Sequence, residues 1–222
     1  QAVLEHGADL GIALDGDGDR VIMADATGAI VNGDELLYIV ATERQKQGLL
    51  HGGVVETVMS NFGLEIALNK RGIPFQRAQV GDRFVHKILV ENGWTLGGGA
   101  SGHMLCLDRT STGDGIVSAL QVLEVMVSSG KTLKELTSDI QKLPQVMINI
   151  PIRGTVSDLF RYEAISAAVS SVENQLGDTG RVILRPSGTE PLVRVTLEGM
   201  DQGQVKKLAE ELADVVRSEL AA

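Results

Sequence analysis

The chain has 222 residues, of which 43% are hydrophobic and 22% charged, a composition typical of a folded globular protein and too apolar for disorder. Its net charge of −9 disfavours nonspecific binding to nucleic acid or anionic membranes, because both require a basic surface. No apolar run reaches the roughly 20 residues of a membrane span, and the first residues do not resemble a secretory signal. We therefore expect neither nucleic acid nor membrane as a partner.

From the N-terminus, Leu10 to Leu14 predicts a buried strand, and Val21 to Ala24 predicts its hairpin partner. Helices and strands then alternate. The predicted helices cover residues 34–47, 62–71 and 83–92, and the predicted strands cover 53–58, 75–79 and 94–97. Strands separated by helices of this length predict βαβ units around a parallel sheet.

A further strand is predicted at 103–107 and a helix at 114–128. Apolar residues occupy most faces of that helix, so we expect it to be buried. The single cysteine, Cys106, lies in an apolar stretch and cannot form an intrachain disulfide. It is interpreted as a buried structural thiol, which fits a reducing, cytoplasmic compartment. Thr132 to Glu135 has the capping-box pattern and predicts another short helix.

The pattern changes near residue 143. A strand at 146–152, a helix ending near Leu176, strands at 181–185 and 192–198 and a final helix form a βαββα sequence. The expected fold is therefore α/β: a βαβ sheet domain followed by a smaller α+β domain.

The strongest local motif is Asp15-Gly16-Asp17-Gly18-Asp19-Arg20. Three carboxylates at alternate positions can converge on one cation, and hard oxygen ligands suit Mg²⁺ or Ca²⁺. The alternative is a solvated acidic turn, but adjacent carboxylates without a cation are electrostatically costly. The motif therefore predicts a divalent metal site, and the following Arg20 suggests that an anion shares it.

A second motif, Arg185-Pro186-Ser187-Gly188-Thr189-Glu190-Pro191, lies close to Arg194. Hydroxyl groups, a glycine that exposes backbone N–H groups and flanking guanidinium groups are typical of a phosphate site. An ordinary β-turn between two strands is the alternative. The two arginines favour the anion site.

Three weaker motifs lie between these two. Gly97 to His103 is a glycine-rich loop that allows close approach of a ligand, and His103 could equally be a partly buried histidine bonded to backbone. Gly81-Asp82-Arg83 is interpreted as a helix start capped by Asp82, and Ser111 to Gly115 as a helix N-terminus. No motif indicates zinc, a Ser/His/Asp triad or a nucleotide phosphate loop.

Together and in this order, the motifs resemble the α-D-phosphohexomutase family, and the resemblance covers the whole chain. Ser101-Gly102-His103 followed by Thr112 to Gly115 is most similar to the branch that acts on glucosamine phosphates. The resemblance implies that residues 1–31 end a second domain, 32–143 form a third, sugar-binding domain, and 144–222 form a fourth, phosphate-binding domain.

The resemblance also implies a role for each motif. Asp15, Asp17 and Asp19 would bind Mg²⁺, with Arg20 beside the transferring phosphoryl group and His103 as a proton carrier. Further groups would contact the sugar: Asp82, Arg83, Ser101 and His103. The phosphate that is not being transferred would be held by Arg185, Ser187, Gly188, Thr189 and Arg194.

The implied activity is an isomerase reaction that interconverts glucosamine 6-phosphate and glucosamine 1-phosphate through a phosphoserine and a bisphosphate intermediate. The family's Thr-Ala-Ser-His-Asn-Pro phosphoserine loop does not occur in these residues. We therefore expect this chain to be inactive alone and to require the missing N-terminal domains of the same enzyme. The sequence leaves the oligomeric state open, a homodimer included.

One position departs from the family pattern: Gly99 stands where the sugar loop has a glutamate that binds sugar hydroxyls. Two alternatives therefore stay open, a mutase for phosphoglucose or phosphomannose and a noncatalytic phosphosugar-binding module. A metal-dependent phosphatase with an aspartate nucleophile would also need a lysine nearby, and the metal loop has none.

Overall fold

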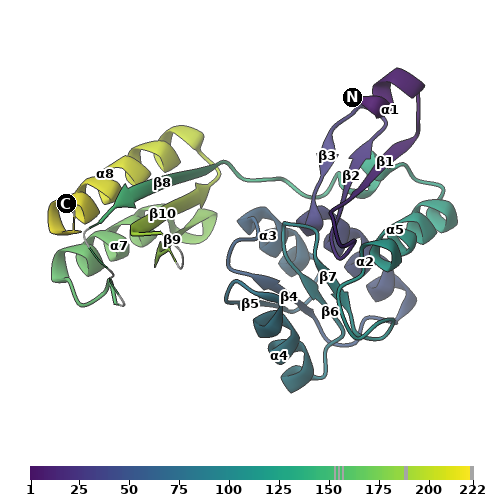
Figure 1. Cartoon of the computed structure of the whole chain (residues 1–222), viewed down its shortest axis with the longest axis horizontal. Helices are drawn as coiled ribbons and strands as arrows, with labels where there is room; N and C mark the ends of the chain where they lie inside the picture. Colours follow the sequence, from purple (N-terminus) through teal and green to yellow (C-terminus); the bar gives the residue numbers. More distant parts are fainter. Residues whose placement is uncertain (153, 155, 157, 188–189, 221–222) are drawn as a thin grey trace. The chain divides into compact units, whose positions relative to one another are not determined.

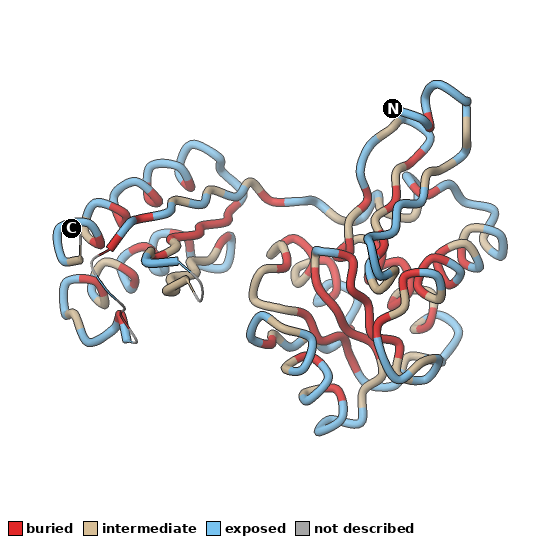
Figure 2. The backbone as a smooth tube through the Cα atoms, in the orientation of Figure 1, coloured by how far each residue is buried: buried red, intermediate tan, exposed pale blue. Residues whose placement is uncertain are grey.

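The computed structural model describes residues 1–152, 154, 156, 158–187 and 190–220. The chain forms two compact units, Gln1–Gln141 and Lys142–Ala222 (Figure 1). Each unit has its own buried apolar core (Figure 2). None of the helices in the described residues is long and apolar enough to cross a bilayer.

The first unit begins with a small antiparallel sheet. Helix α1 (Ala2–His6) precedes three strands in the order β1-β2-β3: β1 (Leu10–Leu14), β2 (Val21–Asp25) and β3 (Ile30–Val31). Leu14 pairs with Val21, so residues 15–20 close the β1–β2 hairpin.

Leu10 to Leu14 forms the predicted strand, but the prediction that this strand is buried is wrong. Ile12 and Leu14 are 44% and 43% exposed, whereas Val21 and Met23 on the neighbouring strand are buried. The reason is position in the sheet. Strand β1 lies at the edge and pairs, among the described residues, with β2 alone, while β2 has a strand on both sides.

A mixed sheet with the strand order β5-β4-β6-β7 forms the centre of the first unit. Strand β4 is parallel to β5 and β6, as the predicted βαβ units require, and β7 is antiparallel to β6. The elements follow the predicted order: α2 (Gly33–Gln47), β4 (Val54–Thr57), α3 (Phe62–Lys70), β5 (Phe75–Ala78), α4 (Asp82–Asn92), β6 (Leu96–Gly98), β7 (Met104–Cys106), α5 (Gly115–Ser129) and α6 (Leu133–Leu136).

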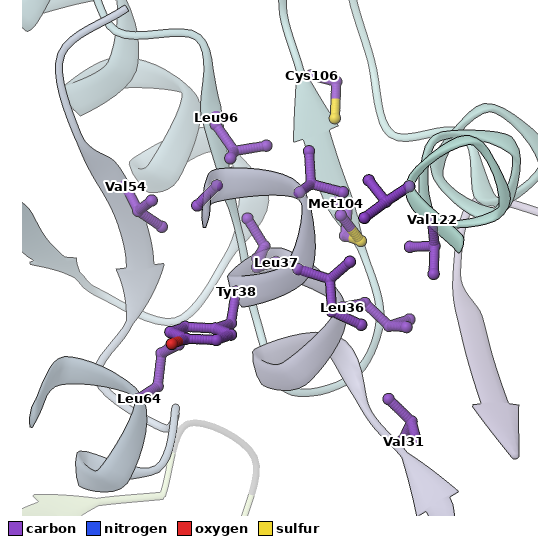
Figure 3. Close-up of a cluster of buried hydrophobic side chains, with 14 of the residues drawn as sticks. Val31, Leu36, Leu37, Tyr38, Val54, Leu64, Leu96, Met104, Cys106 and Val122 are labelled. Carbon is purple, nitrogen blue, oxygen red and sulfur yellow. The ribbon is translucent and has the colours of Figure 1, made fainter. Parts of the chain in front are cut away.

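Helices cover both faces of this sheet. Side chains alternate between the two faces along each strand, and apolar side chains on both faces must be buried. Val54, Leu96 and Met104 pack into the larger cluster with residues of α2, α3 and α5 (Figure 3). Val55 and Leu105 point to the other face and pack against α4. With both faces covered, the loops at the ends of the strands are free to form a site.

Helix α5 is only half buried, which corrects the prediction of full burial. It buries Val122 and Val125 in the core, but Ile116, Leu120 and Val127 are 58%, 59% and 84% exposed. Apolar residues occur all round the helix, yet the described residues cover one side. The buried thiol is confirmed: burial raises the pKa of Cys106, and Gln121 donates a hydrogen bond to its sulfur at 3.1 Å.

The second unit has the predicted βαββα order: β8 (Gln145–Pro151), α7 (Glu163–Leu176), β9 (Gly180–Pro186), β10 (Leu192–Gly199) and α8 (Gln202–Leu220), with a short 3₁₀ turn at Gly177–Thr179. Its antiparallel sheet has the order β8-β10-β9, and α7 and α8 pack against it. A buried ion pair joins β9 to β10, where Arg181 Nε donates to Glu198 Oε2 at 2.6 Å.

Candidate functional site

The loop that closes the β1–β2 hairpin gathers the three predicted metal ligands. Carboxylate oxygens of Asp15, Asp17 and Asp19 all lie within 4.8 Å of one another. Gly18 adopts a left-handed conformation with φ 75°, which permits the tight turn. Oδ1 of Asp19 is buried and has no hydrogen-bond partner. A buried oxygen of this kind and two nearby carboxylates fit a hard divalent cation.

Electrostatic strain is visible within this loop. Partial desolvation, followed by the charges of Asp17 and Asp15, raises the pKa of Asp19. At Asp15, partial desolvation raises the pKa. The hydrogen bond from the Arg20 backbone N–H and the charge of Arg20 outweigh this effect, so the pKa of Asp15 is lowered overall. Arg20 Nε lies 3.4 Å from Asp15 and 3.6 Å from Asp19, so one guanidinium group faces two of the three carboxylates. The loop retains negative charge for a cation.

Backbone contacts attach this loop to distant parts of the first unit. Val21 N donates to Gly102 O at 3.1 Å, and Gly115 N donates to Gly18 O at 2.9 Å. The predicted helix N-terminus at Ser111 to Gly115 therefore contacts the loop through Gly115. The carboxylate of Asp114 accepts hydrogen bonds from the N–H groups of Ile116 and Val117 and caps α5.

His103 connects two segments that are far apart in the sequence. Its Nε2 lies 3.4 Å from Asp19 Oδ2, and its Nδ1 lies 3.2 Å from Asp82 Oδ1. The residue is only 7% exposed. The ring thus faces two carboxylates, not the backbone. Gly113 packs so tightly against it that a Cβ there would lie 2.2 Å from His103 Nε2.

Asp82 does not cap α4, which corrects the sequence interpretation. The N-cap is Gly81, with φ 126°, and Asp82 is the first helical residue. Its carboxylate faces His103 instead. Arg83 is exposed, and its guanidinium group lies 4.6 Å from the centre of the Phe84 ring.

A cavity of about 370 Å³ lies where these segments meet. Its lining residues include Arg20, Asp82, Ser101 and His103 from the predicted motifs, together with Thr57 and Met59; the others are Val80, Gly81, Gly98, Gly99 and Ala100. Arg83 is not among them. Sequence reasoning missed Thr57 and Met59, although Thr57 ends the parallel strand β4 and Met59 follows it, and ligands of α/β sheets commonly bind at this end of the strands.

The two adjacent glycines of the cavity wall have different surroundings. A Cβ at Gly98 would lie 2.4 Å from His103 O and 2.8 Å from Leu37 Cδ1. A Cβ at Gly99 would meet only Thr57, at 3.5 Å, which is ordinary van der Waals contact. Gly98 is therefore required by close packing, whereas Gly99 leaves space beside Thr57.

We expect Gly98→Ala to lower the free energy of unfolding by about 1–3 kcal/mol, because the new methyl group overlaps backbone and core atoms. Gly99→Ala should change it by less than about 0.5 kcal/mol. Urea denaturation of the two variants measures the difference. An equal loss of unfolding free energy in Gly98→Ala and Gly99→Ala would contradict the open space beside Thr57.

The second predicted site lies in the C-terminal unit. Arg185 on β9 pairs directly with Arg194 on β10. Desolvation, followed by the charge of Arg194, lowers the pKa of Arg185. Like charges on opposed strand positions repel, and an anion between them removes that cost. The pair is therefore suited to bind a phosphate.

The loop beside this pair is partly described. Ser187 N donates to Leu192 O at 2.8 Å, and Ser187 Oγ accepts a hydrogen bond from Glu190 N at 3.3 Å. Arg194 Nη2 donates to Glu190 Oε2 at 3.2 Å, while its Nε is buried without a hydrogen-bond partner. Gly188 and Thr189 lie outside the described residues.

Comparisons with known proteins give a consistent picture. Residues 32–143 match the model of phosphoglucomutase/phosphomannomutase alpha/beta/alpha domain III, and residues 147–215 match the C-terminal domain of the same family. The phosphoglucosamine mutase of Thioalkalivibrio sulfidiphilus is 55% identical over 219 residues, covering 98% of this chain and 49% of that protein. The phosphoglucosamine mutase of Methylococcus capsulatus is 56% identical over 216 residues, covering 97% and 48%. The chain thus spans about half the length of the curated relatives it matches.

Solved structures share the fold. A structure of Aspergillus fumigatus N-acetylphosphoglucosamine mutase has a TM-score of 0.80 at 22% identity, covering 95% of this chain and 48% of that one. A second structure of that protein, in complex with GlcNAc-6P and magnesium, has a TM-score of 0.77 at 22% identity, covering 95% and 49%.

Proposed function

The chain belongs to the phosphoglucomutase/phosphomannomutase family, and from this premise we propose that it is the C-terminal part of a cytoplasmic phosphoglucosamine mutase. The observation that carries the proposal is His103, whose ring contacts a carboxylate of the metal loop and Asp82 at the wall of one cavity. The similarity to phosphoglucosamine mutases supports the amino sugar as substrate. We also propose the division into 1–31, 32–143 and 144–222 as the end of the second, the third and the fourth domain.

In the proposed reaction, a phosphoserine outside these residues transfers its phosphoryl group to O1 of glucosamine 6-phosphate. The resulting 1,6-bisphosphate reorients and returns its 6-phosphoryl group to the serine, which leaves glucosamine 1-phosphate. Phosphoryl transfer of this kind depends mainly on positioning and on stabilising the spreading negative charge. The residues of this chain supply both.

Asp15, Asp17 and Asp19 would hold Mg²⁺, because their carboxylates converge and Asp19 has an oxygen without a partner. When bound, Mg²⁺ neutralises charge on the transferring group. Arg20, which follows these three residues in the chain, lines the cavity and would add a guanidinium group beside the transferring phosphoryl group.

Ser101 and Asp82 lie on the cavity wall within reach of a sugar, and we propose that they bind its hydroxyl groups. Each ring nitrogen of His103 lies within 3.4 Å of a carboxylate oxygen, and an imidazole can take up a proton at one nitrogen while it gives up a different proton from the other. We propose that His103 carries the hydroxyl proton during transfer. Arg83 would act only from the rim, since it is exposed.

In the C-terminal unit, Arg185, Arg194 and Ser187 would bind the phosphate that is not being transferred, with Gly188 and Thr189 proposed from sequence alone. The sugar must bind in two orientations during the reaction. A site that recognises a phosphate through paired guanidinium groups would accept either phosphate of the bisphosphate, because those groups bind the phosphate oxygens and not the sugar ring.

We expect the chain to bind Mg²⁺ weakly, since three carboxylates supply only half of an octahedral shell. Asp17→Ala should abolish the binding, whereas alanine at the exposed Asp9, outside the loop, should leave it unchanged. Isothermal titration calorimetry of the three proteins measures the effect. Submicromolar affinity, or equal affinity in the wild type and Asp17→Ala, would count against the assignment.

A second candidate is a mutase for another hexose phosphate, because Gly99 removes the glutamate by which the family pattern would recognise the sugar hydroxyls and so leaves the choice of sugar open. The resemblance expects a glutamate there, and the open space beside Thr57 lacks that carboxylate. Titration of the chain with glucosamine 6-phosphate, glucose 6-phosphate and mannose 6-phosphate, followed by NMR at Ser101 and His103, separates the two. Preference for glucosamine 6-phosphate supports the first proposal, preference for either other sugar supports the second, and shifts elsewhere contradict both.

A further inference from the structure

Thr57 is a polar residue of the cavity wall to which the proposed reaction gives no role. It ends the central strand β4 and is half-buried. Its hydroxyl oxygen accepts a hydrogen bond from Met59 N at 3.3 Å. Its hydroxyl hydrogen has no acceptor among the described residues. A donor that lines a cavity without an acceptor in the protein is suited to bind a polar group of a ligand.

The register of the central sheet places this hydroxyl beside Gly99. Strand β4 runs parallel to β6, with Glu56 opposite Gly98, so Thr57 and Gly99 occupy the next pair of positions and face the same side of the sheet. A Cβ at Gly99 would lie 3.5 Å from both Oγ1 and Cγ2 of Thr57. The space that opens where Gly99 has no side chain is therefore bordered directly by the Thr57 hydroxyl.

Backbone contacts fix the position of this hydroxyl. Thr57 pairs with Ala78 of the neighbouring strand β5. Its carbonyl oxygen accepts hydrogen bonds from Ser60 N at 3.1 Å and from Arg77 Nη1 at 3.3 Å. A polar group that is held in place before the ligand arrives loses little conformational entropy on binding, so its hydrogen bond contributes more to affinity.

The hydrogen-bonding capacity of a threonine determines what can enter this space. A hydroxyl group has one donor and two acceptor lone pairs, and Met59 N already uses one of the lone pairs of Thr57. The remaining donor requires an oxygen with a lone pair, which a sugar hydroxyl provides. The protonated amino group of an amino sugar has no lone pair and cannot accept it. A ring hydroxyl therefore fits beside Thr57 better than the amino group does.

We propose that Thr57 is a substrate-binding residue that donates a hydrogen bond to a ring hydroxyl of the hexose, and that this hydroxyl enters the space left open by Gly99. A glutamate at position 99 would only accept hydrogen bonds from the sugar, whereas Thr57 donates one. Recognition of the hydroxyl would thus come from the central strand and not from the sugar loop. The proposal rests on the function proposed above.

The first test compares wild-type chain, Thr57→Val and Thr57→Ser in NMR titrations with glucosamine 6-phosphate, followed at Ser101 and His103. Valine keeps the shape of threonine and removes the hydroxyl, so the affinity should fall by about 2- to 13-fold, the effect of one hydrogen bond. Serine restores the hydroxyl and should keep the wild-type affinity. Equal losses in both variants would overturn the proposal, because the methyl group and not the hydroxyl would then matter.

The control is Thr42→Val on α2. The Thr42 hydroxyl donates to the carbonyl oxygens of Tyr38 and Ile39 in its own helix, and Thr42 does not line this cavity. The control should leave the affinity unchanged. Gly99→Ala places a methyl group in the space beside Thr57 and should also weaken the binding of the sugar phosphate. Full affinity in Gly99→Ala would contradict the entry of a hydroxyl there.

The second test varies the ligand. The 3-deoxy and 4-deoxy analogues of glucosamine 6-phosphate each lack a ring hydroxyl that the reaction does not change. One of them should bind the wild type more weakly than the parent sugar does, and the same analogue should show no further loss with Thr57→Val. If Thr57→Val weakens all three ligands equally, its effect is structural and the proposal is wrong.

The outcomes separate this proposal from the proposed function. If glucosamine 6-phosphate shifts Ser101 and His103 and binds wild type and Thr57→Val equally well, the function stands and the role of Thr57 fails. If only glucose 6-phosphate or mannose 6-phosphate binds, and Thr57→Val weakens that binding, the role of Thr57 holds and the choice of the amino sugar fails. If no hexose phosphate shifts these signals, both proposals are refuted.

Discussion

A protein comprising residues 1–222 alone should interconvert no measurable glucosamine 6-phosphate, even with Mg²⁺ and a sugar bisphosphate present. The chain has no phosphoserine motif to donate a phosphoryl group. Holding reactants in line supplies on the order of 7–11 kcal/mol of barrier reduction, and this chain cannot hold a donor that it does not carry. A coupled assay for glucosamine 1-phosphate measures the activity.

Adding the N-terminal half of a close relative in trans should restore turnover. In that mixture, Asp17→Ala should abolish the restored activity, and Asp9→Ala, at an exposed carboxylate outside the metal loop, should preserve it. Turnover by the 222 residues alone that disappears in Asp17→Ala would refute the expectation, because the chemistry would then belong to this chain.

Arg185→Met should change phosphate binding and stability in opposite directions. Removing charge-assisted hydrogen bonds of about 1.5–3 kcal/mol should weaken phosphate binding by about 10- to 150-fold. Removing the repulsion from Arg194, which lies directly opposite, should raise the free energy of unfolding by about 0.2–1 kcal/mol. NMR titration with inorganic phosphate, followed at Ser187, gives the affinity, and urea denaturation gives the stability.

The matched control is Arg217→Met on α8, which removes the same charge from an exposed ion pair with Asp214. It should leave phosphate affinity unchanged. If Arg185→Met loses stability and keeps its phosphate affinity, the arginine pair is a packing feature of the sheet and not a phosphate site.

Local patterns were sufficient to predict most elements of this fold, but burial depended on the neighbours of each element. Leu10 to Leu14 reads as a buried strand because none of its five residues has a polar side chain, yet its exposure follows from an edge position that no local pattern encodes. Helix α5 shows the same limit, since Ile116 and Leu120 are apolar and exposed.

In the candidate site, too, some features were predictable from local sequence and others depend on the fold. The convergence of Asp15, Asp17 and Asp19 was predictable because the three lie within five residues of one another. The contact of His103 with Asp82 depends on the strand order of the sheet, and Thr57 and Met59 are residue types with no chemical signature.

The packing of Gly113 against His103 has a consequence for how this sequence can evolve. Any side chain at position 113 collides with the imidazole, so a substitution there is tolerated only if residue 103 first becomes smaller. Because His103 also contacts Asp19 and Asp82, that first step disturbs two loops at once. The two positions should therefore show strong sign epistasis. When a library randomised at positions 103 and 113 is selected for folded protein, it should return the His–Gly pair or small residues at both positions. Variants that combine His103 with a side chain at position 113 should be nearly absent.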